Sequence, residues 1–256
     1  MLERPEFNES NEQILCEMGG KNADMLMNIK VKRLSEGEVF SLKDPENETA
    51  FLLLQGQLTF TADGTEYETA YRENPFSKTP YALHVCKDTE VKINAIKDSE
   101  VLIQQTDNDR EFDTVFYTPQ NCLYQVFGAS QWEGTGLRTV STMFDLSNAP
   151  YSNMVMGEVF HHTGRWSSYP PHHHPQPEVY YYRFDHPQGF GAAFMGDSVE
   201  KSTDGSVLCI KPHHAHQQVC SPGYQMYYVW LIRHIDGDPW DKTRIYEKEH
   251  EWLAQQ

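Results

Sequence analysis

Three consecutive histidines and a nearby glutamate are the residues of this chain best placed to do chemistry. The histidines occupy positions 172–174, and a Pro-Gln-Pro bridge separates them from Glu178. His172 and His174 are two residues apart, so on an extended strand both side chains leave the same face and His173 points away. A later strand that carries His216 can bring a third imidazole to the same place. The pattern predicts one metal site built from these histidines and Glu178.

Imidazole and carboxylate ligands suit a borderline divalent ion, with zinc as the leading candidate and manganese, iron or nickel as alternatives. Three histidines and one glutamate also leave a coordination position open, as a catalytic site requires. A single histidine cluster between prolines is as readily an exposed polar loop. A second cluster at 213–216, placed at the start of a later strand, favours the metal interpretation.

The same two-residue alternation predicts which of the remaining candidates face the metal site. If His216 lies on a strand, His214 shares its face and His213 lies outside, so His214 becomes a pocket residue or a substitute ligand. Tyr180 and Tyr182 then share the face of Glu178. A phenol near a metal can donate a proton or hold a substrate hydroxyl, although packing in a β core explains each tyrosine equally well.

The amino-acid composition indicates which kinds of molecule the protein binds. The chain has 21 Lys and Arg against 37 Asp and Glu, a net charge of −16, which disfavours non-specific binding to nucleic acid or to an anionic membrane. Its longest apolar runs are too short to span a bilayer, and its first residues lack the features of a secretory signal. We therefore expect a cytoplasmic protein that binds small molecules, with a homo-oligomer left open. The five cysteines, without any C-x-x-C pair, indicate reduced thiols.

Short segments rich in β-branched and aromatic residues, separated by Gly, Pro, Asn and Asp, predict an all-β fold. Two such series suggest two β domains, at residues 1–130 and 131–256. Gly56 predicts a tight connection between strands at 50–55 and 57–62, and a short helix is expected at 247–253. His84 is the single histidine of the first series, which therefore lacks the means to bind metal in the same manner.

These motifs resemble a known family. The segment 166–174, with Trp-Ser-Ser-Tyr-Pro-Pro-His-x-His, the segment 178–184, and Pro-Gly-Tyr-Gln-Met-Tyr-Tyr at 222–228 are similar to the 5-deoxyglucuronate isomerases of inositol catabolism. That family is related to the 5-keto-4-deoxyuronate isomerases of the cupin superfamily. The resemblance extends to Leu-Leu-Gln-Gly at 53–56 and to the tail at 249–253, so it covers most of the chain.

The resemblance implies a bicupin, two tandem β-barrels of the jelly-roll type, in which only the second binds metal. Its ligands fall on His172, His174, Glu178 and His216. The implied reaction is an aldose–ketose isomerisation that converts 5-deoxy-D-glucuronate to 2-deoxy-5-keto-D-gluconate. This reaction needs a catalytic base, for which Tyr182, Tyr180 and His214 are the candidates.

The implied substrate also carries a carboxylate. Arg183, Lys211 or Arg233 could bind it, with an exposed salt bridge as the alternative for each. Two departures from the family leave the substrate open. The bridge between His174 and Glu178 is short, and His214 replaces a glycine. A cupin-type iron oxygenase and a non-catalytic sugar-binding cupin are the alternatives.

Overall fold

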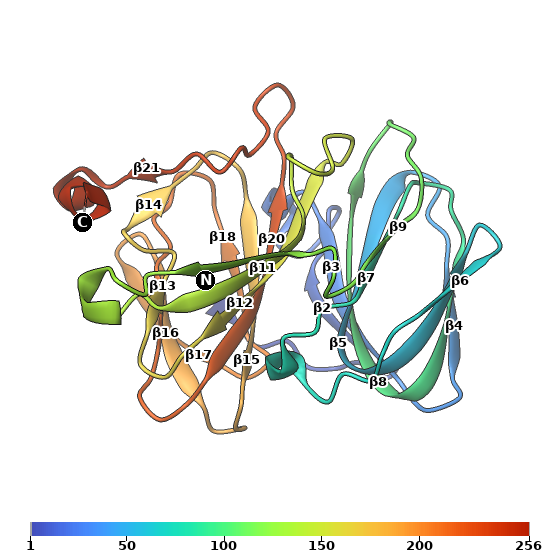
Figure 1. The fold of residues 1–256 in the computed structure, drawn as a ribbon. Coiled ribbons are helices and arrows are strands. Elements are labelled where there is room, and N and C mark those ends of the chain that lie inside the picture. Colours follow the sequence, from blue (N-terminus) through green and yellow to red (C-terminus); the bar gives the residue numbers. More distant parts are fainter. Residues whose placement is uncertain (1, 256) are drawn as a thin grey trace. The chain divides into compact units, whose positions relative to one another are not determined.

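The computed structural model describes residues 2–255, and nearly all of its regular structure is β (Figure 1). The chain divides into two compact units. Unit 1 holds residues 2–5, 123–147 and 154–255 of the described chain, and unit 2 holds Glu6–Cys122 and Asn148–Asn153. The all-β class predicted from the sequence is confirmed. The chain passes from unit 2 to unit 1 between residues 122 and 123. The predicted division between residues 130 and 131, into a metal-free and a metal-binding barrel, stays a prediction.

Unit 2 is an antiparallel β structure built on two long neighbouring strands. Its main sheet has the order β2-β3-β8-β5-β7-β9, while β4 pairs with β8 and β6 pairs with β5. The strands are β2 (Glu12–Cys16), β3 (Asn28–Leu34), β4 (Val39–Leu42), β5 (Asn47–Ala62), β6 (Thr65–Glu68), β7 (Ala82–Val85), β8 (Val91–Asp107) and β9 (Val115–Tyr117). Two 3-10 turns, η1 (Ala23–Met25) and η2 (Pro75–Ser77), complete the unit.

Strand β5 shows how the sequence builds this core. Residues 50–54 of the strand are a continuous apolar run that is buried on both faces, and after Gly56 buried Leu58, Phe60 and Ala62 alternate with less buried residues. The predicted connection at Gly56 is wrong, because the strand continues through this residue with shifts in its pairing to β8. Gly56 has a φ of 99°, and a Cβ there would lie 2.1 Å from Oγ of Ser99, so only glycine fits. The neighbouring β8 is also a single long strand, of 17 residues.

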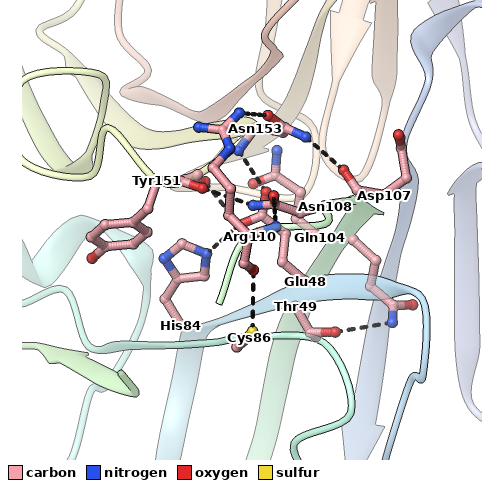
Figure 2. Close-up of polar contacts among 12 residues, drawn as sticks. Glu48, Thr49, His84, Cys86, Gln104, Asp107, Asn108, Arg110, Tyr151 and Asn153 are labelled. Carbon is pink, nitrogen blue, oxygen red and sulfur yellow. Dashed lines mark hydrogen bonds and ion pairs between the residues drawn. The ribbon is translucent and has the colours of Figure 1, made fainter. Parts of the chain in front are cut away.

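A buried carboxylate holds the segment Asn148–Asn153 within unit 2 (Figure 2). Oε2 of Glu48 accepts a hydrogen bond from the Ser152 hydroxyl at 2.9 Å and lies 2.8 Å from Nε2 of His84. Its other oxygen, Oε1, accepts a hydrogen bond from the backbone N–H of Asn153 at 2.6 Å. Glu48 and His84 are fully buried. The single histidine of the first β series therefore takes part in a polar network that ties this segment to unit 2.

Unit 1 contains three antiparallel sheets (Figure 1). The seven-stranded sheet runs in the order β1 (Leu2–Glu3), β18 (Val207–Ile210), β15 (Glu178–Phe184), β20 (Met226–Arg233), β12 (Met154–His161), β11 (Arg138–Phe144) and β10 (Leu123–Phe127). The four-stranded sheet has the order β13 (Trp166–Ser167), β19 (Gln218–Cys220), β16 (Phe190–Met195) and β17 (Ser198–Thr203). β14 (His172–His173) pairs with β21 (Ile245–Tyr246), and the 3-10 segments are η3 (Trp132–Gly134) and η4 (Lys248–Gln255).

The core of unit 1 is aromatic on the face that carries the candidate site. Tyr180, Tyr182, Tyr228 and Trp230 belong to one buried cluster, and the rings of Tyr180 and Tyr228 stack with centroids 4.4 Å apart. Alternation along β15 and β20 puts these rings on one face, because every second residue of a strand points the same way.

The helix expected near the carboxyl end is present as the 3-10 segment η4. No helix among residues 2–255 is long and apolar enough to cross a membrane.

Candidate metal centre

Three segments of unit 1 bring the predicted ligands together. His172 lies on the short strand β14, and Glu178 is the first residue of β15, where it pairs with Ile210 on one side and Ile232 on the other. His216 lies in the irregular segment that leads into β19. Glu178 thus projects from a strand in the interior of the sheet, and the segment at and after β14 and the segment before β19 supply the histidines.

The centre of the group is one carboxylate oxygen. Oε2 of Glu178 lies 3.2 Å from Nε2 of His174 and 3.1 Å from Nε2 of His216. One ligand atom from each of the three residues lies within 4.8 Å of the other two, and all three side chains are buried. Among residues 2–255 this is the group of histidine, cysteine and acidic side chains that could hold a metal ion.

His172 lies next to this group rather than within it. Its ring centroid is 4.9 Å from that of His216, and its side chain is buried. Burial lowers the pKa of His172 well below its ordinary value, and the neighbouring His216 lowers it further. Nδ1 of His172 lies 2.8 Å from the carbonyl oxygen of Pro170, so Nδ1 carries the hydrogen and Nε2 keeps a lone pair.

The hydrogen bonds of His216 provide a test of whether these residues fit a cation. Nδ1 of His216 lies 2.9 Å from the carbonyl oxygen of His214, and an oxygen of this kind only accepts. In the neutral tautomer that this bond sets, Nε2 presents a lone pair to Oε2 of Glu178. Two lone pairs at 3.1 Å repel unless a proton or a metal ion lies between them. A backbone carbonyl that orients a histidine in this way is also the usual outer support of a metal ligand.

The carboxylate is in the form that binds metal. Burial by itself would raise the pKa of Glu178, but the neighbouring imidazoles of His174 and His216 outweigh it, and the pKa is held below the ordinary value. In the same group, Nδ1 of His174 is buried without a hydrogen-bond partner among the described residues. The donor set of neutral imidazole and ionised carboxylate therefore fits a divalent ion.

A cavity of about 240 Å³ opens over these residues, all within unit 1. Besides His172, His174, Glu178 and His216, its wall carries aromatic rings and three cationic side chains. The aromatic residues are Phe127, Tyr180, Tyr228, Trp230 and Trp240, and the cationic residues are Arg138, Lys242 and Arg244. The group that could hold a metal ion thus forms part of the wall of a cavity large enough to admit a small ligand.

The two candidate tyrosines occupy different places. Tyr180 lines the cavity, and its hydroxyl shares a hydrogen bond of 2.8 Å with Oγ of Ser168. Burial, and then the nearby charge of Glu178, raise the pKa of Tyr180 well above its ordinary value. Tyr182 is buried, is not part of the cavity wall, and donates its hydroxyl to Oε1 of Gln218 at 2.5 Å. Tyr228, which the sequence did not single out, lines the cavity beside Tyr180.

Three other predicted residues lie outside the cavity wall. Arg183 is on the opposite face of β15, where its Nε lies 2.9 Å from Asp204. Lys211 and His214 are exposed. The parity argument for His214 fails, because β19 begins only at Gln218 and His214 is exposed whereas His216 is buried. The roles assigned to these residues stay predictions without support from the geometry of the cavity.

The cationic residues of the cavity wall were not indicated by the sequence. Arg138 begins β11, far along the chain from both histidine clusters, and Lys242 and Arg244 lie in the loop before β21. No motif marks them, because each is an isolated basic residue in an ordinary context. Only the pairing of β11 with β12, and of β21 with β14, brings these segments to the cavity.

The sequence as a whole matches one family. A sequence model of the KduI/IolB family matches residues 1–253. The chain belongs to the KduI/IolB family. Among its curated relatives are the 5-deoxy-glucuronate isomerases of Bacillus subtilis subsp. natto, 23% identical, and of Bacillus licheniformis, 24% identical. Each alignment covers 100% of this chain and 98% of the relative.

Solved structures show the fold of this KduI/IolB family member in other proteins. An IolB-like protein from Salmonella typhimurium LT2 aligns with a TM-score of 0.88 at 23% identity, covering 99% of this chain and 98% of that one. An oxalate decarboxylase from Lactobacillus farciminis aligns with a TM-score of 0.67 at 13% identity, covering 96% and 85%. The architecture is therefore shared with the first protein in detail, and with the second at the level of the fold.

Proposed function

We propose that this protein is a metal-dependent sugar-acid isomerase that converts 5-deoxy-D-glucuronate to 2-deoxy-5-keto-D-gluconate. The curated relatives, aligned over the full chain, are named 5-deoxy-glucuronate isomerases. The observation that carries the proposal is the convergence of His174 and His216 on one oxygen of Glu178, inside a cavity that can admit a small ligand.

The metal would be held by His174, Glu178 and His216, with His172 as the fourth ligand through its free Nε2. Zinc is the leading candidate, and manganese, iron and nickel suit the same ligands. The metal supplies polarisation of the carbonyl group of an open-chain sugar. We place it in unit 1 alone, which corresponds to the metal-binding barrel of the predicted bicupin.

The protein's own side chains perform the remaining steps. The isomerisation moves one proton from the carbon next to the aldehyde to the aldehyde carbon, and moves the hydroxyl proton of that neighbouring carbon to the aldehyde oxygen. It therefore needs a donor and an acceptor but no external oxidant. Tyr180 has a raised pKa and stays protonated near neutral pH. Its phenol therefore serves as a hydrogen-bond donor to a substrate oxygen, with Ser168 holding its orientation.

The test combines metal analysis with proton NMR. Purified protein should contain about one equivalent of a divalent metal per chain, as four ligands to one ion require. In deuterated water, 5-deoxy-D-glucuronate should disappear and its keto product should carry solvent deuterium at the former aldehyde carbon. Oxygen uptake instead of isomerisation would point to an oxygenase, and tight binding without turnover would point to a sugar-binding protein. Either result would overturn the proposal.

A further inference from the structure

The charge of the cavity wall contrasts with that of the chain. The whole protein carries a net charge of −16, yet the wall combines one carboxylate, Glu178, with the cations Arg138, Lys242 and Arg244. Lys242 is neutralised by Asp145, whose carboxylate lies 2.8 Å from its Nζ. No ion pair of Arg138 or Arg244 is found within residues 2–255. Two guanidinium groups thus bring uncompensated positive charge to the cavity.

Arg138 is the better buried of the two. It is 7% exposed, and its Nη1 donates a hydrogen bond of 2.9 Å to the carbonyl oxygen of Gly136. Its guanidinium carbon lies 5.2 Å from the centre of the Phe127 ring. A guanidinium has five N–H donors, and the bond to Gly136 uses one of them. A buried cation without a counter-ion is costly, so this arrangement is retained most readily where a ligand supplies the anion.

The surroundings of Arg138 connect it to the candidate metal centre. Burial lowers the pKa of Arg138, and the positive charge of Arg244 is among the neighbouring charges that lower it further. Tyr228 and Tyr180 are also close enough to act on its charge. The Tyr180 ring in turn lies 6.0 Å from the ring of His216. One continuous wall therefore runs from the guanidinium groups past the two tyrosines to the metal-binding histidines.

We propose that Arg138 binds the carboxylate of the sugar acid, with Arg244 providing a second positive charge at the exposed side of the cavity. A planar guanidinium matches a carboxylate through two parallel hydrogen bonds, which an ammonium cannot reproduce. The substrate then lies with its carboxylate at Arg138 and its carbonyl end at Glu178 and the histidines. This assignment rests on the proposed function for the identity of the substrate, and it replaces Arg183 and Lys211 as the carboxylate-binding residues.

The decisive measurement is binding of two sugars that differ in one group. Calorimetry with D-glucuronate and with D-glucose, which has a CH₂OH in place of the carboxylate, isolates recognition of the charge without any turnover. Hydrogen bonds to a charged group predict that Arg138→Gln weakens D-glucuronate binding about tenfold to a hundredfold and leaves D-glucose binding unchanged. Arg138→Lys should lose an intermediate amount, because it keeps the charge but not the planar fork.

The matched control is Arg4→Gln, since Arg4 belongs to unit 1 but is exposed and bonds to Thr203 and to the carbonyl oxygen of Lys201. It should bind both sugars as the wild type does. If Arg138→Gln does not fold, judged by circular dichroism, Arg244→Gln at the exposed position takes its place and should weaken D-glucuronate binding selectively. Equal losses for both sugars, or no loss for D-glucuronate, would overturn the proposal.

The two proposals can fail separately. If the wild type does not isomerise 5-deoxy-D-glucuronate but Arg138→Gln selectively loses D-glucuronate, the carboxylate site stands and the proposed function falls. If isomerisation occurs and Arg138→Gln raises KM no more than Arg4→Gln does, the proposed function stands and the carboxylate site falls.

Discussion

Nε2 of His216 lies 3.1 Å from Oε2 of Glu178, although one residue comes from the irregular segment before β19 and the other from the start of β15. The opposite nitrogen of His216 is occupied by the carbonyl oxygen of His214. The relationship places a lone pair of nitrogen against a carboxylate, and a cation between them resolves the repulsion. The candidate metal centre depends on this contact more than on any other.

The first prediction concerns metal binding. His216→Ala should lower the bound metal from about one equivalent to below about a tenth, because a structural or catalytic site of four ligands weakens steeply when one is removed. Metal content measured by inductively coupled plasma mass spectrometry checks this, together with circular dichroism to establish folding. His213→Ala, an exposed histidine of the same cluster, is the control and should retain the metal. Full occupancy in His216→Ala would contradict the ligand assignment.

The second prediction separates the two candidate tyrosines. Tyr180→Phe removes a phenol from the cavity wall and should reduce kcat about tenfold to a hundredfold while the fold persists. Tyr182→Phe breaks the buried hydrogen bond to Gln218 and should act mainly on stability, costing about 1–3 kcal/mol. Steady-state kinetics and urea unfolding of both variants provide the comparison. A larger loss of kcat in Tyr182→Phe than in Tyr180→Phe would reverse the assignment.

The third prediction concerns the buried network of unit 2. Glu48→Gln replaces the carboxylate that accepts hydrogen bonds from Ser152 and Asn153 with a neutral amide that has one acceptor oxygen, so these bonds are weakened. We expect the free energy of unfolding to fall by about 1–3 kcal/mol. Urea denaturation measures this loss. Glu46→Gln, at an exposed position two residues earlier, should change it by less than about 0.5 kcal/mol.

The fourth prediction concerns acid stability. Burial lowers the pKa of His161 from its ordinary value to about 3, which means that the folded state resists a proton that the unfolded chain accepts. Stability from this group is complete above the ordinary pKa near 6.5 and is lost as the pH falls from there toward 3. The loss for one proton has a slope of up to about 1.4 kcal/mol per pH unit.

His161→Gln should therefore flatten the dependence of unfolding free energy on pH in that range, whatever its stability at pH 7. Urea melts at several pH values between 4 and 7 test this expectation. His186→Gln changes a more exposed histidine and should keep the wild-type slope. The same slope in the wild type and His161→Gln would show that His161 does not set the acid sensitivity.

The sequence allowed predictions about residues that lie close together along the chain. The spacing of His172 and His174 and the alternation from Glu178 to Tyr180 were enough to indicate a metal site, because these residues are neighbours along extended chain. The argument failed for His214 because it assumed that the strand already includes this residue, whereas β19 begins at Gln218. It also divided β5 at Gly56, since a glycine that permits a bulge within a strand has the same sequence signature as one that ends it.

The residue types, their short-range spacing and the glycine, proline and Asx residues between strands were thus enough to predict the all-β class and the family, and to propose the donor residues of the candidate metal centre. The contact of His216 with Glu178 and the approach of Arg138 and Arg244 to the cavity come from strand pairing between distant segments. No local pattern encodes such contacts, because their free energy comes from burying many side chains at once. The candidate metal ligands could therefore be proposed from the chain, whereas the cationic residues of the cavity wall could be found only from the fold.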